Sequence, residues 1–237
     1  MFSKKLHIVL SIICAGSLIT LFASSNAVAG PFDSMKSLAS AGGSGGGGSV
    51  SRASLDKLYK LVTGAEALLD KSVNIAFSMV ANKEEIEKFT QRQKEIEKIQ
   101  DPKERDAAMN KFREDQNAIV TKATEKAETA KKIESLDGKQ KKLFGDSVFN
   151  VVLAALMDKE AVETSKSLSA ALKSNPTAAA SFSNDVPRVT NIASSLPEQA
   201  KKAMDLGSAL TKLAKTAKVE VAVPASAATA PKAVDFN

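Results

Sequence analysis

Few side chains in this sequence can carry out chemistry. The 237 residues include one cysteine, Cys14, one histidine, His7, and no tryptophan. Both residues lie within residues 1–29, which have the features of a removable leader. Without that leader the chain has no thiol and no imidazole. This excludes a Ser-His-Asp triad, a Cys-His pair, zinc bound by cysteine or histidine, and histidine-ligated haem. We therefore expect no catalytic residue, no metal ligand and no cofactor.

Carboxylates are the remaining candidates, because two acids can hydrolyse a glycosidic bond. The conspicuous acids alternate with lysines, as on the solvated face of a helix; they are Glu84, Glu85, Glu87, Glu95 and Glu97. Sugar clefts usually present aromatic platforms, and Tyr59 is the only tyrosine. A carboxylate-dependent cell-wall hydrolase is therefore the least favoured of three functions.

The amino-terminal residues have the form of a signal peptide. Two lysines in residues 1–5 precede a mainly apolar run over 6–22, and Ala27-Val28-Ala29 is the small-x-small pattern cut by a signal peptidase. A retained anchor would need about 20 apolar residues, whereas this run is shorter. We expect cleavage before Gly30, no stable transmembrane segment afterwards, and a periplasmic protein, with secretion or outer-membrane association left open.

The charge balance argues against a nucleic-acid partner. Removing residues 1–29 takes away Lys4 and Lys5, so 33 minus 2, or 31, basic residues face 27 acidic ones. An excess of four creates too weak a field to imply binding to nucleic acid. Since the trimmed chain cannot form an internal disulfide, its stability must come from packing.

Residues 30–50 combine a short amphipathic segment with a linker rich in glycine and serine. Phe32, Met35 and Leu38 follow a helical spacing, so they are candidates for docking on a partner as a small helix. The composition of the segment favours disorder over such docking. The tract over 42–49 should act as a flexible tether.

Helical periodicity dominates residues 51–218. Apolar residues recur three and four positions apart, as at Leu58, Leu61, Val62, Ala65, Leu68 and Leu69. Start signals are Asn82 with Glu85, Asp101 with Pro102, Asp137 with Gln140, Asn175 with Pro176, Asp185 with Pro187, and Ser195 with Pro197. The third helix should run from Pro102 to about Ser135. The stretch over 148–157 is apolar almost all round, which predicts the central core helix.

These patterns predict an all-α, elongated up-and-down bundle of four to six helices with a flexible amino-terminal tether and a carboxy-terminal tail. Residues 219–237 are rich in Ala, Val and Pro, which predicts disorder. Long helices with near-heptad seams favour a non-catalytic interaction or scaffolding protein of the bacterial cell envelope, whose partner is an envelope protein or a second copy. The alternative is a periplasmic protein that binds lipid or another apolar ligand between its helices.

Overall fold

The computed structural model describes residues 50–234, and this part of the chain contains helices and no strand. The helices are α3 (Arg52–Val80), α4 (Lys83–Glu97), α5 (Pro102–Thr124), α6 (Ala127–Glu134), α7 (Gly138–Ser174), α8 (Pro176–Ser181) and α9 (Val186–Thr216). The predicted all-α class is confirmed. None of these helices is long and apolar enough to cross a membrane.

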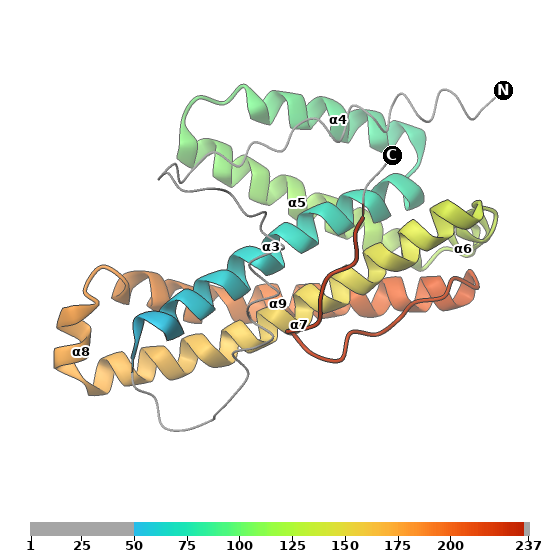
Figure 1. Ribbon diagram of the computed structural model, residues 1–237. Coiled ribbons are helices and arrows are strands. Elements are labelled where there is room, and N and C mark those ends of the chain that lie inside the picture. Colours follow the sequence, from blue (N-terminus) through green and yellow to red (C-terminus); the bar gives the residue numbers. More distant parts are fainter. Residues whose placement is uncertain (1–49, 235–237) are drawn as a thin grey trace.

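Three long helices form the body of the molecule (Figure 1). Helices α3, α7 and α9 alternate in direction, and α7 packs against both of the others. Helices α4 and α5 form an antiparallel pair, and α5 connects this pair to α3 and α9. With 37 residues, α7 is on the order of 55 Å long. The arrangement is therefore the predicted elongated up-and-down bundle, and α7 is its central helix.

Helices α4, α5, α7 and α8 begin at predicted capping residues, whereas Asp185, before α9, makes no capping hydrogen bond with its side chain. Asn82 accepts a hydrogen bond of 2.9 Å from the Glu85 amide, and the Glu85 carboxylate accepts one of 2.8 Å from the Asn82 amide. Asp137 and Gln140 form the same reciprocal arrangement at the start of α7. Such caps satisfy amide groups that have no partner within the helix.

Two predicted helix boundaries are wrong. The predicted helix to Ser135 is interrupted, since α5 ends at Thr124 and α6 begins at Ala127. The bend brings Ile133, which is fully buried, into the core beside α3 and α9. Conversely, no helix starts at Ser195, because α9 continues through Pro197. Leu196 is buried, as are Val189 earlier in α9 and Ala200 later in it. Burial on both sides of Pro197 offsets the backbone hydrogen bond that proline cannot donate.

The core consists of two clusters that both include residues of α7. One cluster joins α7 to the aromatic residues of α3, α4 and α5, and includes Phe77, Phe89, Phe112, Phe144 and Val151. The other joins α7 to the first half of α3 and the start of α9, and includes Leu55, Leu58, Leu153, Met157 and Val189. The stretch over 148–157 is buried except for Val152 and Leu156, as expected for a central helix.

Residues 219–234 follow a defined path over the helices, in contrast to the disorder that their composition predicts. At the end of α9, Lys218 has a positive φ of 56°, and the Val219 amide donates to the Ala214 carbonyl at 2.8 Å. Val219 and Val234 are both buried. We call residues 219–234 the strap. These two buried valines hold the strap on the helices, although the overall composition of the segment is typical of a disordered tail.

Candidate functional site

The predicted docking residues Phe32, Met35 and Leu38 lie outside the described residues. The acids from Glu84 to Glu97 all lie on or beside α4, with Glu85 capping the helix. Glu95 accepts a hydrogen bond from Gln91 at 3.1 Å, and Glu87 pairs with Lys83 at 3.6 Å. These contacts are those of a solvated helix surface, as the sequence predicts. Within residues 50–234, no three carboxylates lie together in a way that could hold a metal ion.

The strap is held on α7 by a buried polar contact between residues far apart in the chain. Asn150 is fully buried, and its side-chain amide donates to the Lys232 carbonyl at 2.9 Å. Its side-chain oxygen accepts a hydrogen bond of 2.8 Å from the Lys232 amide. One side chain thus satisfies both backbone groups of one residue, as a neighbouring β-strand would. The Lys232 ammonium also lies 5.3 Å from the centre of the Phe149 ring.

A glycine on α7, Gly145, lets the first residues of the strap approach closely. A Cβ atom at Gly145 would lie 2.6 Å from the Glu220 carbonyl oxygen and 3.4 Å from a methyl group of Val219. Any larger residue would therefore displace the backbone of the strap. Figure 1 shows the strap running from the end of α9 along the bundle and then turning back across α7. The turn is held by the Thr229 amide, which donates to the Ser226 carbonyl at 3.1 Å.

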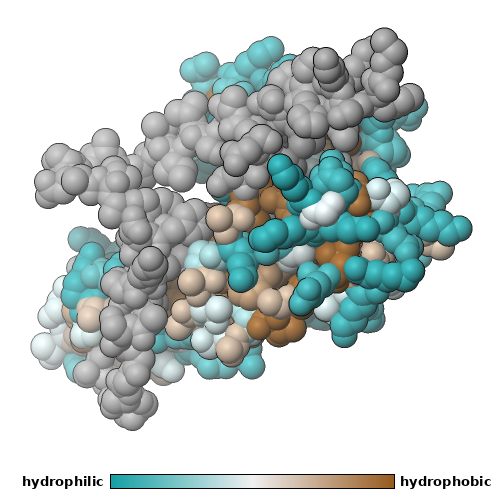
Figure 2. All heavy atoms as spheres, turned by 45° about the vertical axis from the view of Figure 1, so that its right-hand side comes forward, coloured by the Kyte–Doolittle hydropathy of each residue, from teal (hydrophilic) through white to brown (hydrophobic). Residues whose placement is uncertain are grey.

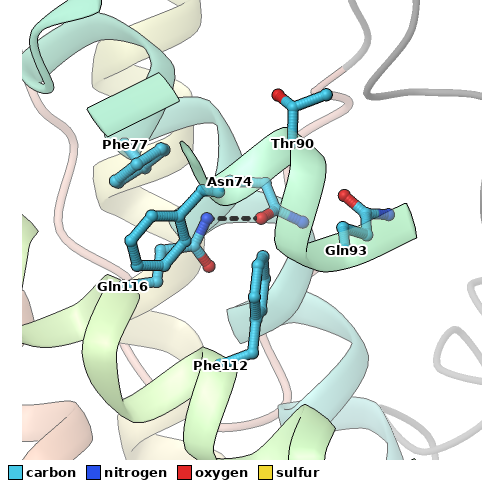
Figure 3. Close-up of a pocket in the computed structure, with 7 residues that line it drawn as sticks. Asn74, Phe77, Thr90, Gln93, Phe112 and Gln116 are labelled. Carbon is cyan, nitrogen blue, oxygen red and sulfur yellow. Dashed lines mark hydrogen bonds between the residues drawn. The ribbon is translucent and has the colours of Figure 1, made fainter. Parts of the chain in front are cut away.

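A shallow hollow lies between α3, α4 and α5 (Figure 3). Phe77 lies 4.9 Å from Phe89, and Phe89 lies 5.1 Å from Phe112, measured between ring centres. The Gln116 side-chain amide donates to the Asn74 side-chain oxygen at 2.7 Å beside these rings. The hollow leaves a volume of about 10 Å³ for the centre of a water molecule, which is roughly the space that one water needs. It is therefore too small for a lipid tail or another ligand of ordinary size.

Three carboxylates with raised pKa values lie on α3 and α7. Asp158 is 3% exposed, and its burial, together with the negative charge of Glu66, raises its pKa to about 7. Desolvation of the carboxyl groups by the surrounding protein also raises the pKa of Glu66 and of Asp70, with Arg113 opposing both shifts. A general acid must contact its substrate, and a carboxyl group as buried as Asp158 cannot. We interpret Asp158 as a residue whose ionisation lowers the stability of the fold.

A polar cluster joins the starts of α3 and α9. The Tyr59 hydroxyl donates to Asp185 at 2.8 Å, and Arg52 donates to the same carboxylate at 3.1 Å. The Arg188 guanidinium lies 4.1 Å from the centre of the Tyr59 ring. Partial burial and the Asp185 carboxylate raise the pKa of Tyr59 to about 12, so the phenol remains a neutral donor. These contacts tie two helix ends together.

Asn150, Gly145 and Asp158 do not stand out in the sequence as functional residues. Asn150 interrupts the apolar stretch of α7, and a polar residue inside a buried run is itself a signal that a specific partner lies opposite. The partner could not be named, because Lys232 is 82 positions away. Gly145 carried no signal, since one glycine in a helix fits many explanations.

Few large apolar side chains are exposed among residues 50–234. Figure 2 shows hydrophobic residues reaching the surface in small groups between hydrophilic ones. The large apolar side chains that are exposed in residues 50–234 are Met204, at 45%, and Val223, at 74%. Comparison of the chain with protein-family models, with curated proteins and with solved structures finds no match.

Proposed function

We propose that this chain is an exported, non-catalytic helical protein that acts by binding other proteins as an interaction or scaffolding component of the bacterial cell envelope. The observation that carries the proposal is the pairing of Asn150 with both backbone groups of Lys232. A helical bundle that holds an extended chain through its backbone has the means to bind polypeptide.

The geometry of α7 supports this role beyond one pair of hydrogen bonds. Gly145 provides space for the backbone at Glu220, and the buried ring of Phe149 lies beneath the ammonium of Lys232. Backbone hydrogen bonds supply affinity, and contacts with alternate side chains supply specificity, in the known modes of extended-peptide recognition. Both kinds of contact are present along this helix.

The export of the protein is part of the proposal and has its own test. Amino-terminal sequencing of the protein recovered from cells should give Gly30 as the first residue, as the small-x-small pattern over 27–29 predicts. An intact Met1 on all recovered protein would contradict export by this leader.

Photo-crosslinking in intact cells tests the binding role. A benzophenone amino acid replaces Val223, which is 74% exposed on the strap. The matched control carries the same probe at Lys83, whose side chain is 88% exposed at the start of α4. We expect the probe at 223 to capture one defined envelope protein or a second copy, identified by mass spectrometry after cell fractionation.

Two results would contradict the proposed function. The first is an identical set of crosslinked proteins with the probe at 223 and at 83, which would mean that the probe captures proteins by random collision. The second is the absence of any adduct at 223, together with a defined lipid that co-purifies with the protein in native mass spectrometry. That outcome would favour the lipid-binding alternative.

A further inference from the structure

The excess positive charge of the described residues is concentrated at one end of the bundle. Residues 50–234 hold 30 basic and 25 acidic residues. The segments 126–146 and 212–218 contain nine of these basic residues and four of the acidic ones, so the remaining 21 basic residues are balanced by 21 acidic residues. An excess that is small for the whole chain is therefore a dense local charge.

The two segments meet in space at the ends of three helices. Lys218, just after α9, donates a hydrogen bond of 2.6 Å to the Glu134 carboxylate at the end of α6. Together with the positive charge of Lys141 near the start of α7, this contact holds the pKa of Glu134 below its ordinary value. Figure 1 shows α6, the start of α7 and the end of α9 at the same end of the bundle. We call six exposed lysines of this end the lysine face: Lys131, Lys139, Lys142, Lys212, Lys215 and Lys218.

Three of the four acids in these segments are already engaged. Glu134 pairs with Lys218, and Asp146 pairs with Lys142. Asp137 caps the start of α7. Among residues 50–234, no carboxylate forms an ion pair with the other four lysines of the face, which are Lys131, Lys139, Lys212 and Lys215. These ammonium groups are therefore available to an anionic partner.

The composition of the lysine face fits a membrane surface better than a protein. Every basic residue in the two segments is a lysine, whereas the arginines of the chain all lie elsewhere. Protein interfaces are enriched in arginine and aromatic residues and depleted of lysine, and the one aromatic residue of the two segments, Phe144, is fully buried. A lysine ammonium is a hydrated point charge, which suits the diffuse negative charge of lipid headgroups.

The lysine face also lacks large apolar side chains that could insert into a bilayer. Met204 and Val223, the exposed residues of that kind among residues 50–234, lie outside the two segments. Binding would therefore depend on charge, at the level of the headgroups, and would be reversible and sensitive to salt.

We propose that the lysine face binds the anionic phospholipid surface of a membrane through the phosphates of its headgroups. The lysine face and the pairing of Asn150 with Lys232 are separate features of the molecule. The inference therefore goes beyond the proposed protein-binding role.

Sedimentation with lipid vesicles tests the proposal. The protein recovered from cells is mixed either with vesicles of phosphatidylcholine or with vesicles that also contain about one third phosphatidylglycerol, at about 0.05 M salt, where screening is weak. We expect binding to the anionic vesicles only. Raising the salt to about 0.5 M should release the protein.

A triple variant removes one unpaired lysine from each helix, by the changes Lys131→Gln, Lys139→Gln and Lys215→Gln. It should bind anionic vesicles roughly a hundredfold more weakly than the wild type, because three charges lose their attraction to the surface. The matched control changes three exposed lysines at the opposite end of the bundle, by Lys60→Gln, Lys166→Gln and Lys173→Gln. The two variants have the same net charge, and glutamine is as good a helix former as lysine. Both should fold, as circular dichroism checks, and the control should bind nearly as tightly as the wild type.

The proposal is overturned if the wild type binds both kinds of vesicle equally, or binds neither. It is also overturned if the two triple variants lose affinity equally, because binding would then follow net charge rather than the lysine face. Failure with vesicles would leave an acidic protein as the partner for this face. The vesicles contain no protein, so their outcome is independent of the crosslinking at Val223 that tests the proposed function.

Discussion

Buried polar side chains on α3 and α7 affect the free energy of unfolding. Asp158 is the clearest case, because its pKa is about 7 in the folded protein, whereas the ordinary value is 3.8. Between these two values the folded state holds a proton that the unfolded state has released. The free energy of unfolding therefore falls as pH rises from about 4 to 7, by roughly 1.4 kcal/mol for each pKa unit at most.

Replacing Asp158→Asn should remove this loss. The variant should be more stable than the wild type at pH 8, by a few kcal/mol at most on the scale of about 1.4 kcal/mol per unit, and the difference should vanish near pH 4. Urea unfolding at a series of pH values measures it. Glu163→Gln, which removes an exposed acid of the same helix, is the control. A constant difference at all pH values would show that the effect of Asp158 is steric.

Two buried serines on facing helices should respond in opposite directions. The Ser72 hydroxyl has no hydrogen-bond partner among the described residues, although Ser72 is fully buried. The Ser147 hydroxyl, equally buried, donates to the Phe144 carbonyl at 2.7 Å. An unsatisfied buried polar group costs about 1–3 kcal/mol, and a satisfied hydrogen bond contributes about 0.5–1.5 kcal/mol.

Ser72→Ala should therefore raise the melting temperature, and Ser147→Ala should lower it. Both substitutions remove one oxygen from a helix and leave a similar apolar surface, so each is the control for the other. Differential scanning calorimetry measures the two shifts. A loss of stability in Ser72→Ala would mean that its hydroxyl has a partner beyond residues 50–234.

At the scale of elements, the sequence predicts starts better than ends or interruptions. Asn82, Asp101 and Asp137 cap their helices as predicted, because capping depends on residues within one turn. The bend before Ala127 and the continuation through Pro197 depend on which side chains are buried by other helices. Such tertiary burial overrides local propensity, so a single sequence does not reveal it.

The strap illustrates the same limit for the candidate site. Its composition predicts disorder, yet valines at 219 and 234 and one backbone pairing place it on α7. Asn150 and Lys232 are distant in sequence, so no local pattern could pair them. The motif that the sequence did offer, over residues 32–38, lies outside the described residues.

The packing of the strap on α7 depends on a hydrogen atom at position 145. Gly145→Ala would place a methyl group 2.6 Å from the Glu220 carbonyl oxygen. Because that oxygen belongs to the backbone, the strap must move, and overpacking of this kind costs about 1–3 kcal/mol. We expect a lower melting temperature and faster proteolytic cleavage between residues 220 and 234.

The matched control for Gly145 lies on the same helix. A Cβ atom at Gly138 would meet nothing within 4 Å, so Gly138→Ala should leave the strap in place. It should be neutral or slightly stabilising, since alanine favours the helical state. Equal cleavage of the strap in the two variants would contradict the close approach at Gly145.

At the scale of the whole molecule, helix α7 makes the two core clusters interdependent, whereas α4 is attached to the bundle chiefly through α5. Helix α7 contributes buried residues to both clusters. Helix α4 packs chiefly against α5 and buries only Ile86, Phe89 and Ile96. Elements with few buried contacts open at lower free energy than the global transition. Local opening should therefore begin in α4.

Native-state hydrogen exchange provides the test. Amides over 148–157 should exchange only through global unfolding, while amides of α4 should exchange at least tenfold faster, which corresponds to about 1.4 kcal/mol of lower opening free energy. Phe89→Leu should speed exchange in α4 further, because it removes the ring that lies between Phe77 and Phe112, and should change the middle of α7 less. Uniform protection of α4 and α7 would mean that the two helices unfold as one unit, and that the second layer of helices is as integral to the fold as the three long helices beneath it.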